Sequence, residues 1–305
     1  MNDKEWLADR FEEHRTRLQA VAYRMLGSLA EAEDAVQDAW LRASGSGADE
    51  VENLGAWLTT IVARVCLNLL RSRRPRRRES LEVHVPDPMV SLDRETQPEE
   101  AAAMADSVGL ALLVVLDMLT PAERLAFVLH DTFGLPFEEI APVVGRTPAA
   151  ARQLASRARR RIRGADVPVA DSNFVLQRAV VDAFFRAARE GDFDALVDVL
   201  DPGVVLRIDG GVKLAAASMV VHGATAVAEQ TQKGLRSVLS RPVVQLHPAI
   251  VGGTAGVVVT LNGQPITVMG FTIVDGRIAE IDAISDPDRV PRIVPAVESG
   301  TCTHG

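Results

Sequence analysis

Apolar residues recur at helical spacing through the first part of the chain. Residues three and four apart share one face of a helix, so stripes of this kind predict amphipathic helices. The stripes run through Leu18–Leu26, Leu29–Ala43 and Leu54–Arg74. A Gly27-Ser28 break separates the first two, and the polar stretch Ser44–Asn53 predicts a loop before the third. Residues 1–78 are therefore expected to form an all-helical domain.

A second helical segment, residues 107–165, ends in a pattern typical of a helix-turn-helix. An apolar helix that begins at Phe137 stops at Gly145, whose missing Cβ suits a sharp turn. Thr147 followed by Pro148 is an N-cap with proline at the first helical position, so a second helix begins there. Its apolar residues are expected to face inward: Ala151, Leu154, Ala158 and Ile162. Its polar residues are expected on the other faces: Arg152, Gln153, Ser156, Arg157 and Arg160.

Those outward side chains have the chemistry of DNA readers. Arginine offers a two-pronged donor to guanine edges and glutamine can pair with adenine, each good contact being worth about 1–3 kcal/mol of discrimination. The net charge of −8 argues against a nucleic-acid partner, but positive charge is concentrated at Arg71–Arg78 and Arg152–Arg163. Local patches decide such binding. The alternative is a solvated basic helix in some other α-hairpin.

After Gly164 the pattern changes from helical to mixed. Ser172 can cap a helix over Phe174–Arg189, Gly191-Asp192 ends it and caps a short helix through Leu200, and a further helix is expected near Ala224–Leu235. Strands are expected at Val243–Val251, Ala255–Leu261, Gln264–Val274 and Arg277–Ile284. Asn262-Gly263 and Asp275-Gly276 are tight-hairpin signals. This segment is therefore expected to be an α+β unit with helices on a curved antiparallel sheet.

Composition narrows the class of protein. The 305 residues suffice for two or three domains, and the two cysteines, Cys66 and Cys302, suggest neither a disulfide framework nor a metal cluster. No metal site and no cofactor are expected. The charged N-terminus does not resemble a signal peptide and no apolar run has the length of a membrane span, so a cytoplasmic protein without a membrane partner is expected. Residues 79–106 hold eight acids against Arg94 as the lone base and predict an extended acidic linker.

Three blocks in the first half resemble regions 2 and 4 of a bacterial extracytoplasmic-function sigma factor: Ala32–Ala43, Trp57–Arg78 and Leu119–Arg163. The resemblance implies region 2 at residues 1–78 and region 4, which reads the upstream minus-thirty-five element, at 107–165. It also implies that core RNA polymerase and promoter DNA are the partners. The linker at 79–106 would then thread the polymerase cleft.

The resemblance assigns roles to individual residues of the helical domain. A helix face would dock on core polymerase through Asp34, Gln37, Asp38 and Trp40. The end of the third helix would read the minus-ten element through Asn68, Arg71, Arg73 and Arg74, with the Ser44–Asn53 loop placed to hold an extruded base. Trp57 lies on the apolar stripe and is expected to be core rather than a base stacker. Without the family, the acidic pair would equally suit a solvated face and the arginines a helix-terminal cap.

The C-terminal half, residues 172–290, is similar to SnoaL-like cone-shaped α+β domains, with 291–305 as a tail. Sigma factors with this extension carry short markers, and altered forms of them occur here at Asp209–Lys213, Ser285–Val290 and His84–Pro88. The usual tryptophan and third glycine are absent. The resemblance implies a regulatory contact between this domain and the sigma regions, through Asp209, Gly210, Gly211, Lys213, Asp286, Pro287, Asp288 and Arg289. A small-molecule ligand in its pocket is left open.

Two other functions compete with a sigma factor under cis regulation. One is a stand-alone helix-turn-helix regulator that never contacts polymerase. The other is a cyclase- or isomerase-like enzyme with a DNA-binding appendage, whose acid and base candidates would be Asp209, His222, His247 and Asp282. A plain hairpin turn would also explain Asp209–Lys213. We expect a non-enzymatic protein with no catalytic residues.

Overall fold

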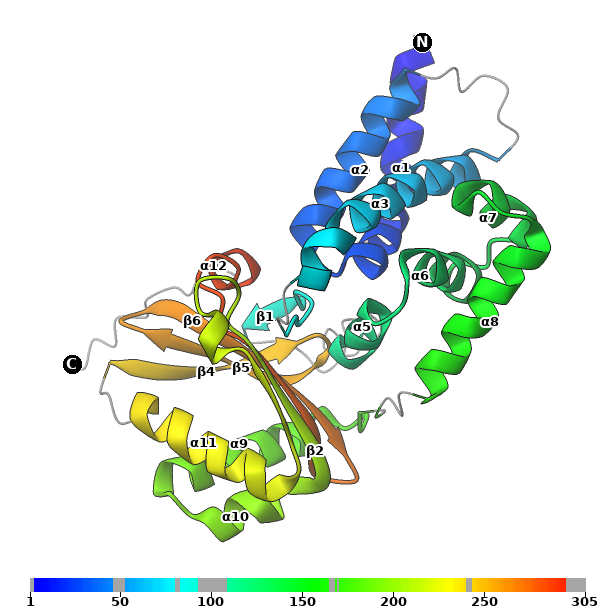
Figure 1. Ribbon diagram of the computed structural model, residues 1–305. Helices are drawn as coiled ribbons and strands as arrows, with labels where there is room; N and C mark the ends of the chain where they lie inside the picture. The colour runs from blue at the N-terminus through cyan, green and yellow to red at the C-terminus, as the bar shows by residue number, and fades with distance from the viewer. Residues whose placement is uncertain are drawn as a thin grey trace. The chain divides into compact units, whose positions relative to one another are not determined.

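The computed structural model describes residues 3–45, 53–79, 83–92, 109–164, 168, 170–239 and 243–294, and of residues 3–5, 73–79 and 235–239 it describes the backbone alone (Figure 1). The chain divides into two compact units. The first comprises Met1–Leu81 and Leu112–Val167, and the second comprises Glu82–Ala111 and Pro168–Gly305. The segment that follows the first helical domain therefore belongs to the unit formed by the C-terminal half.

The first unit begins with three mutually packed helices: α1 (Asp3–Leu26), α2 (Leu29–Ser44) and α3 (Leu54–Glu79). Gly27 has a φ of 71°, the left-handed conformation that glycine tolerates, so the predicted break between α1 and α2 is confirmed. Leu18 of α1 and Val62 of α3 are fully buried where these helices meet. Burial of one apolar face per helix thus holds this part together.

The buried face of α3 differs in part from the apolar stripe expected at helical spacing, which consists of Trp57, Leu58, Ile61, Val62, Val65 and Leu69. Leu58 and Val65 are buried as expected, whereas Leu69 is 36% exposed and Leu70 is buried beside it. Trp57 is half-buried. The expectation that no apolar run has the length of a membrane span is wrong for Leu54–Ser72, which has that length and apolar composition. Within the fold, 44% of its apolar window is buried, and the helix packs on α1 and α2. It therefore reads as the core helix of a helical domain.

Shorter helices complete the first unit. They are α5 (Leu110–Asp117), which spans the division between the units, α6 (Pro121–Phe127), the π-helical turn η1 (Val128–Thr132), α7 (Phe137–Val144) and α8 (Pro148–Gly164). The Glu123 amide donates to Thr120 Oγ1 and the Thr120 amide donates to Glu123 Oε2. These two hydrogen bonds form a capping box at the start of α6. The apolar pattern at Ala101–Leu119 also predicts a helix; α5 covers Leu110–Asp117 of it, and residues 101–108 lie outside the described part.

The second unit is an α+β domain. Its helices are α9 (Phe174–Glu190), α10 (Phe193–Asp198), α11 (Ala224–Leu239) and α12 (Val290–Ile293), with a short turn η2 (Ala215–Ala217). Its strands are β1 (Val90–Leu92), β2 (Leu200–Asp209), β3 (Met219–His222), β4 (Val244–Val251), β5 (Thr254–Leu261), β6 (Gln264–Val274) and β7 (Arg277–Ile284). The four expected strands are confirmed within a residue at each end.

These strands form a sheet in the order β1-β4-β5-β6-β7-β2-β3. The expectation of an antiparallel sheet is wrong at one place, because β2 pairs with β7 in parallel, with Leu206 opposite Ile281. The helix α10 directly precedes β2 in the chain, so β2 enters the sheet from a helix rather than from a hairpin, and β3 follows and pairs with it antiparallel. The sequence pattern also missed β1. This strand pairs antiparallel with β4, with Ser91 opposite Ile250, and extends the sheet at that edge.

Turn chemistry behaves largely as expected. Asn262 and Asp275 have φ values of 52° and 50°, as tight two-residue hairpins require. Gly191 ends α9 in the left-handed conformation. The expected cap at Ser172 is wrong, because Asn173 caps α9 by accepting a hydrogen bond from the Leu176 amide.

The core of the second unit lies between the curved sheet and the helices. Figure 1 shows α9, α10 and α11 on one side of the sheet. Phe184 and Phe185 of α9 contact Phe271 of β6 edge to face, with ring centroids 5.6 and 5.9 Å apart. Alternate residues of each strand enter this core, which is why Ile281 faces the helices while Asp282 lies on the opposite face of the sheet.

Candidate nucleic-acid interface

The helix-turn-helix has the predicted local geometry. Gly145 has a φ of 68° and ends α7. The Ala150 amide donates to Thr147 Oγ1 at 3.3 Å, so Thr147 caps α8 and Pro148 is its first residue. The turn and cap, both readable from the sequence, therefore set the direction in which α8 leaves α7.

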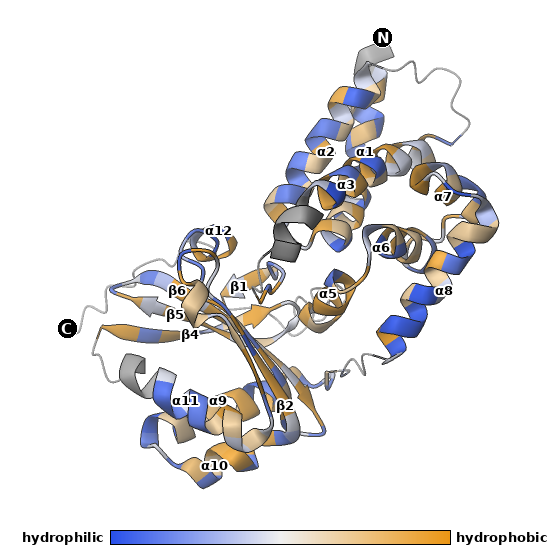
Figure 2. Cartoon of the chain, viewed as in Figure 1, coloured by the Kyte–Doolittle hydropathy of each residue, from blue (hydrophilic) through white to orange (hydrophobic). Residues whose placement is uncertain are grey.

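The residues of α8 divide into a small buried face and a large polar one. Ala151 and Ala158 are fully buried as predicted, and Ala155, which the sequence pattern missed, is buried with them. Leu154 and Ile162 are half-buried. All five predicted DNA-contacting residues are exposed: Arg152, Gln153, Ser156, Arg157 and Arg160. Figure 2 shows hydrophilic residues along most of α8.

Not every arginine of α8 is available to a partner. Arg159 forms an ion pair with Asp131 at 3.2 Å, and Arg161 donates to Glu123 Oε2 at 2.6 Å. Arg152 places its guanidinium over the Phe137 ring, 5.3 Å from the centroid, while remaining exposed. Arg159 and Arg161, of which Arg161 is itself exposed, tie α8 to neighbouring elements through these ion pairs. The exposed Arg152, Arg157 and Arg160 can meet phosphates and bases.

The candidate polymerase-binding residues lie along α2. Asp34 and Gln37 are exposed, whereas Asp38 is half-buried and pairs with Arg42 one turn later at 2.8 Å. Trp40 is half-buried, its ring 5.1 Å from that of Phe11 in α1. The helix thus presents carboxylate and amide groups to solvent beside a tryptophan that also packs on its neighbour.

The candidate minus-ten residues lie in the C-terminal half of α3, which continues to Glu79, beyond the end expected at Arg74. Asn68 and Arg71 are exposed. Arg73 and Arg74 belong to α3, but their side chains lie outside the described residues, as do residues 46–52 of the expected base-holding loop. An exposed amide and guanidinium one turn apart on a helix can meet unpaired bases and phosphates.

A buried arginine that the sequence analysis missed organises the first unit. The Arg124 side chain, 3% exposed, donates to the carbonyl oxygens of Leu116 and Met25 at 2.7 and 2.8 Å and to Asp117 Oδ1 at 2.7 Å. Met25 lies in the last turn of α1 and Leu116 lies in α5, so Arg124 provides hydrogen-bond donors to backbone carbonyls of both helices. The neighbouring capping box was the only sequence signal near it.

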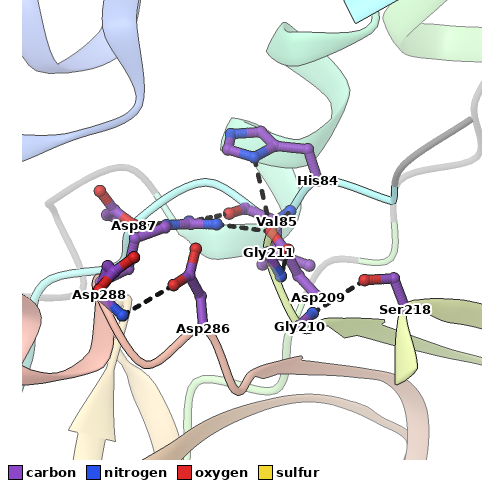
Figure 3. A network of polar contacts seen from close by, with 10 residues as sticks. His84, Val85, Asp87, Asp209, Gly210, Gly211, Ser218, Asp286 and Asp288 are labelled. Atoms are coloured by element: carbon purple, nitrogen blue, oxygen red, sulfur yellow. Dashed lines mark hydrogen bonds and ion pairs between the residues drawn. The ribbon is translucent and has the colours of Figure 1, made fainter. Parts of the chain in front are cut away.

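The three altered markers meet at one cluster inside the second unit, which we call the linker clamp: His84, Val85, Asp87, Asp209 and Arg289. Figure 3 shows the first four of these residues. The Val85 amide donates to Asp209 Oδ2 at 2.9 Å. Arg289 donates to the same oxygen at 2.6 Å, to Asp87 Oδ1 at 2.8 Å through Nε, and to the Val85 carbonyl. His84 Nδ1 lies 3.5 Å from Asp209 Oδ2.

Charge and burial make Asp209 the centre of the linker clamp. It is 2% exposed. Burial alone would raise the pKa of its carboxyl, but hydrogen bonds from His84 and Val85 and the Arg289 guanidinium hold the pKa well below its usual range. The pKa of Arg289 is raised, because the nearby Asp87 and Asp209 outweigh its own burial. Both groups are therefore charged at neutral pH.

Two glycines let the backbone close around this cluster. Gly211 has a φ of 62°, and a Cβ there would collide with the Asp286 carboxylate. A Cβ on Gly210 would collide with the Leu214 carbonyl, and the Gly210 amide donates to Ser218 Oγ at 3.0 Å. The remaining marker residues are peripheral: Lys213 pairs with Asp288 at 2.6 Å, both exposed, and Pro287 is exposed.

The acid and base candidates of the enzyme alternative do not share a site. Asp282 pairs with Arg207 at 3.0 Å on the outer face of the sheet, and burial raises its pKa to about 6. His247 Nε2 lies 2.9 Å from Thr260 Oγ1, and His222 is exposed on β3. None of these, nor Asp209, lines the apolar cavity between the sheet and α11. Among the described residues, no three His, Cys, Asp or Glu side chains could hold a metal ion.

An exposed basic helix of a helix-turn-helix, in one unit with a helical domain, defines a DNA-binding protein with an α+β accessory domain. Family models agree and go further: Sigma-70 region 2 matches residues 10–76, and Sigma-70 region 4 matches residues 109–162.

Whole-length relatives establish the family. The chain is 35% identical over 294 residues to the ECF RNA polymerase sigma factor SigJ of Mycobacterium tuberculosis, covering 92% of this chain and 91% of that protein. It is also 35% identical over 277 residues to the probable ECF RNA polymerase sigma factor SigI of the same species, covering 90% and 91%. The crystal structure of the former matches with a TM-score of 0.70 at 32% identity, covering 95% of this chain and all 100% of that one.

The chain belongs to the extracytoplasmic-function RNA polymerase sigma factors and carries a C-terminal α+β domain. It is a transcription factor that directs promoter-specific initiation, not an enzyme. Sigma factors bind core RNA polymerase and promoter DNA, which sets aside the stand-alone regulator.

Proposed function

We propose that α8 reads the upstream promoter element. Arg152, Gln153 and Ser156 lie on the exposed face of its first turns and would contact base edges in the major groove. Arg157 and Arg160 follow on the exposed side and would neutralise phosphates. The single observation that supports this assignment is that the inward face of α8 consists of buried alanines while all five candidate readers remain in solvent.

We infer corresponding roles for the N-terminal helices. Asn68, Arg71, Arg73 and Arg74 in the C-terminal half of α3 would read the minus-ten element. Asp34, Gln37, Asp38 and Trp40 on α2 would bind core polymerase, with exposed acids facing a basic partner surface. The protein would act in the cytoplasm, where polymerase and promoter DNA are found.

We further propose that the C-terminal domain regulates the sigma regions in cis by holding the linker between them. Between the end of α3 at Glu79 and the start of α5 at Leu110 lie 30 residues (80 to 109), and residues 84–92 are held by the linker clamp and by the pairing of β1 with β4. An extended chain spans at most about 3.3–3.6 Å per residue, so holding nine residues removes roughly 30 Å of reach. Since the linker joins the two promoter readers, its free length limits the distance between the elements they can bind together.

Run-off transcription on promoters of different spacer length tests this proposal. Purified protein and core polymerase are assayed on a cognate promoter whose spacer between the two elements is lengthened or shortened base pair by base pair. Asp209→Asn and Arg289→Gln should broaden the range of spacers that support initiation, because the linker is released. Lys233→Gln, an exposed change in α11 outside the linker clamp, serves as the control. An unchanged spacer profile in both clamp variants would contradict regulation through the linker.

A further inference from the structure

A cavity of about 320 Å³ lies in the second unit between the concave face of the sheet and α11. Phe184, Leu206, Val259, Met269 and Ile281 form most of its apolar wall. Its size is at the lower end of the range of small-molecule sites in proteins. The cavity opens to solvent near Ala217 of η2 and Gly234 of α11, so a molecule has a route into it.

The polar groups of this cavity are neutral. The described residues that line it include no Asp, Glu, His, Lys, Arg, Cys or Tyr. Moving a charged ligand into such a lining would cost its hydration with no opposite charge in return. Among these described lining residues no group can transfer a proton at neutral pH, so they suit binding rather than catalysis.

One end of the cavity carries a hydrogen-bonding pair. Thr267 Oγ1 and Ser285 Oγ lie 3.0 Å apart. In such a pair one hydroxyl donates its hydrogen to the other. The hydroxyl that accepts still has its own hydrogen, which it can donate to a third group. A carbonyl or hydroxyl oxygen of a ligand can accept it. Gln230 and Thr231 add further neutral polar groups from α11.

Two residues that line the cavity, Ile208 and Ser285, are connected directly to Asp209 of the linker clamp. Ile208 lines the cavity and is followed by Asp209, while the Ser285 amide donates to the Asp209 carbonyl at 2.7 Å. The loop from Gly210 to Ser218 closes on itself through the Gly210 amide and Ser218 Oγ, and it places Ala217 at the cavity mouth. A ligand that packs on Ile208 and Ser285 therefore restrains the same backbone that positions Asp209.

We propose that this cavity binds a neutral, largely apolar small molecule carrying a hydrogen-bond-accepting oxygen, and that occupancy stabilises the linker clamp. The second half of this inference rests on the proposed regulatory function of the clamp. The ligand would act as a signal: by restraining Asp209, it would hold the linker more firmly and so reduce the free length between the two promoter readers.

The neutral fluorophore prodan, an apolar naphthalene ketone, is the probe for the site. Titrated into the full-length protein, prodan should show saturable binding with a blue-shifted emission, whereas the charged fluorophore anilinonaphthalene sulfonate should not compete with it. Gly234→Leu should weaken prodan binding by at least about tenfold, because a Cβ at Gly234 meets open space and the side chain fills the mouth. Lys233→Leu adds the same side chain to the neighbouring exposed position and should leave binding unchanged.

Thr267→Val keeps the shape of the side chain and removes one hydroxyl, so it should weaken prodan binding about threefold to tenfold without closing the cavity. Prodan binding that is absent, or equal in the wild type, Gly234→Leu and Thr267→Val, would overturn the proposed site. A thermal melt of each variant guards against loss of the fold.

Hydrogen exchange reads out the connection to the linker clamp. Saturating prodan should slow exchange of the Val85 and Gly211 amides, both of which donate to Asp209, and should not do so in Gly234→Leu. Unchanged exchange with saturable binding would overturn the coupling and leave the site. Because neither measurement uses polymerase, a failure here is distinct from a failure of the spacer experiment, which would remove the regulatory function alone.

Discussion

Arg289 and Asp209 lie 80 residues apart in the chain, and the Arg289 Nη1 atom donates to Asp209 Oδ2 at 2.6 Å in a pocket that leaves the carboxylate 2% exposed. The same guanidinium holds Asp87 and the Val85 carbonyl, so a single side chain joins the end of β2, the segment before α12 and the linker. An exposed ion pair between an arginine and a carboxylate contributes little to the free energy of unfolding. Breaking a buried pair costs more, because the remaining charge has no partner.

Arg289→Gln should therefore destabilise the second unit by about 3 kcal/mol, because Asp209 and Asp87 lose their cation in a desolvated setting. Urea unfolding followed by a probe in the C-terminal domain measures the loss. Lys213→Gln breaks an exposed ion pair with Asp288 and should cost at most about 1 kcal/mol. Equal effects of the two substitutions would show that the Arg289 cluster has no special role in stability.

The buried carboxylates of Asp282 and Asp209 should affect the stability of the second unit in opposite directions as pH changes, each in its own pH range. Burial raises the pKa of Asp282 to about 6, above its unfolded value of about 4. The folded state then holds a proton that the unfolded state has released, so stability falls as pH rises from about 4 to about 6, by at most about 3 kcal/mol. Asp282→Asn should flatten this part of the profile while Glu280 remains paired with Arg207.

Asp209 should contribute the opposite slope at lower pH. Its pKa is lowered in the fold, so the stabilisation is present above its unfolded pKa of about 4 and is lost as pH falls below that value. Asp209→Asn should remove this acid-sensitive part and leave the range between about pH 4 and 6 unchanged. Unfolding free energies measured from pH 3 to 7 separate the two carboxylates, and identical profiles for both variants would contradict the assignment.

Two arginines of α8 should affect promoter binding in different ways. Arg152→Ala should relax sequence preference at the upstream element by about 1–3 kcal/mol, since it removes a base contact. Arg160→Ala should lower the slope of log affinity against log salt by about 0.9 and preserve the preference, since it removes a phosphate contact. Binding of the holoenzyme to matched and mismatched promoters over a range of salt tests both. If the two variants behave identically, α8 is placed wrongly on the DNA.

The turn of the helix-turn-helix should depend on one glycine. Gly145→Ala should destabilise the first unit by about 1 kcal/mol, because its φ of 68° disfavours a Cβ even though no atom lies close to it. Gly164→Ala, at the last residue of α8 and equally free of close neighbours, is the matched control and should be neutral or slightly stabilising. Thermal unfolding compares them, and a loss of stability in the control alone would refute the argument.

Local sequence rules were sufficient for the elements that carry their own signals. Gly145, Thr147 and Pro148 defined the turn before α8, and Asn262 and Asp275 defined two hairpins, because backbone conformation at these positions depends on nearest neighbours. The parallel pairing of β2 with β7 could not be read in this way. A strand's period reveals which of its faces is buried but says nothing about its partner or direction.

The candidate DNA-binding face shows the same division. Spacing alone separated the exposed arginines and glutamine of α8 from its buried alanines. It did not distinguish Arg157 and Arg160 from Arg159 and Arg161, whose acidic partners Asp131 and Glu123 come from distant positions in the chain. Nor did it reveal the buried role of Arg124, since a polar residue is kept in a core only by acceptors that other helices supply.

The sequence by itself determined the helical and mixed halves, the helix-turn-helix and the family, because these depend on periodicity, turn residues and contiguous motifs. The tertiary structure alone decided that His84–Asp87, Asp209 and Arg289 share one buried cluster. It alone decided that the cavity beside that cluster contains no charged residue among those described. Contacts between residues so far apart depend on how strands pair and helices cover them, and that information is distributed over the whole domain rather than carried by any local pattern.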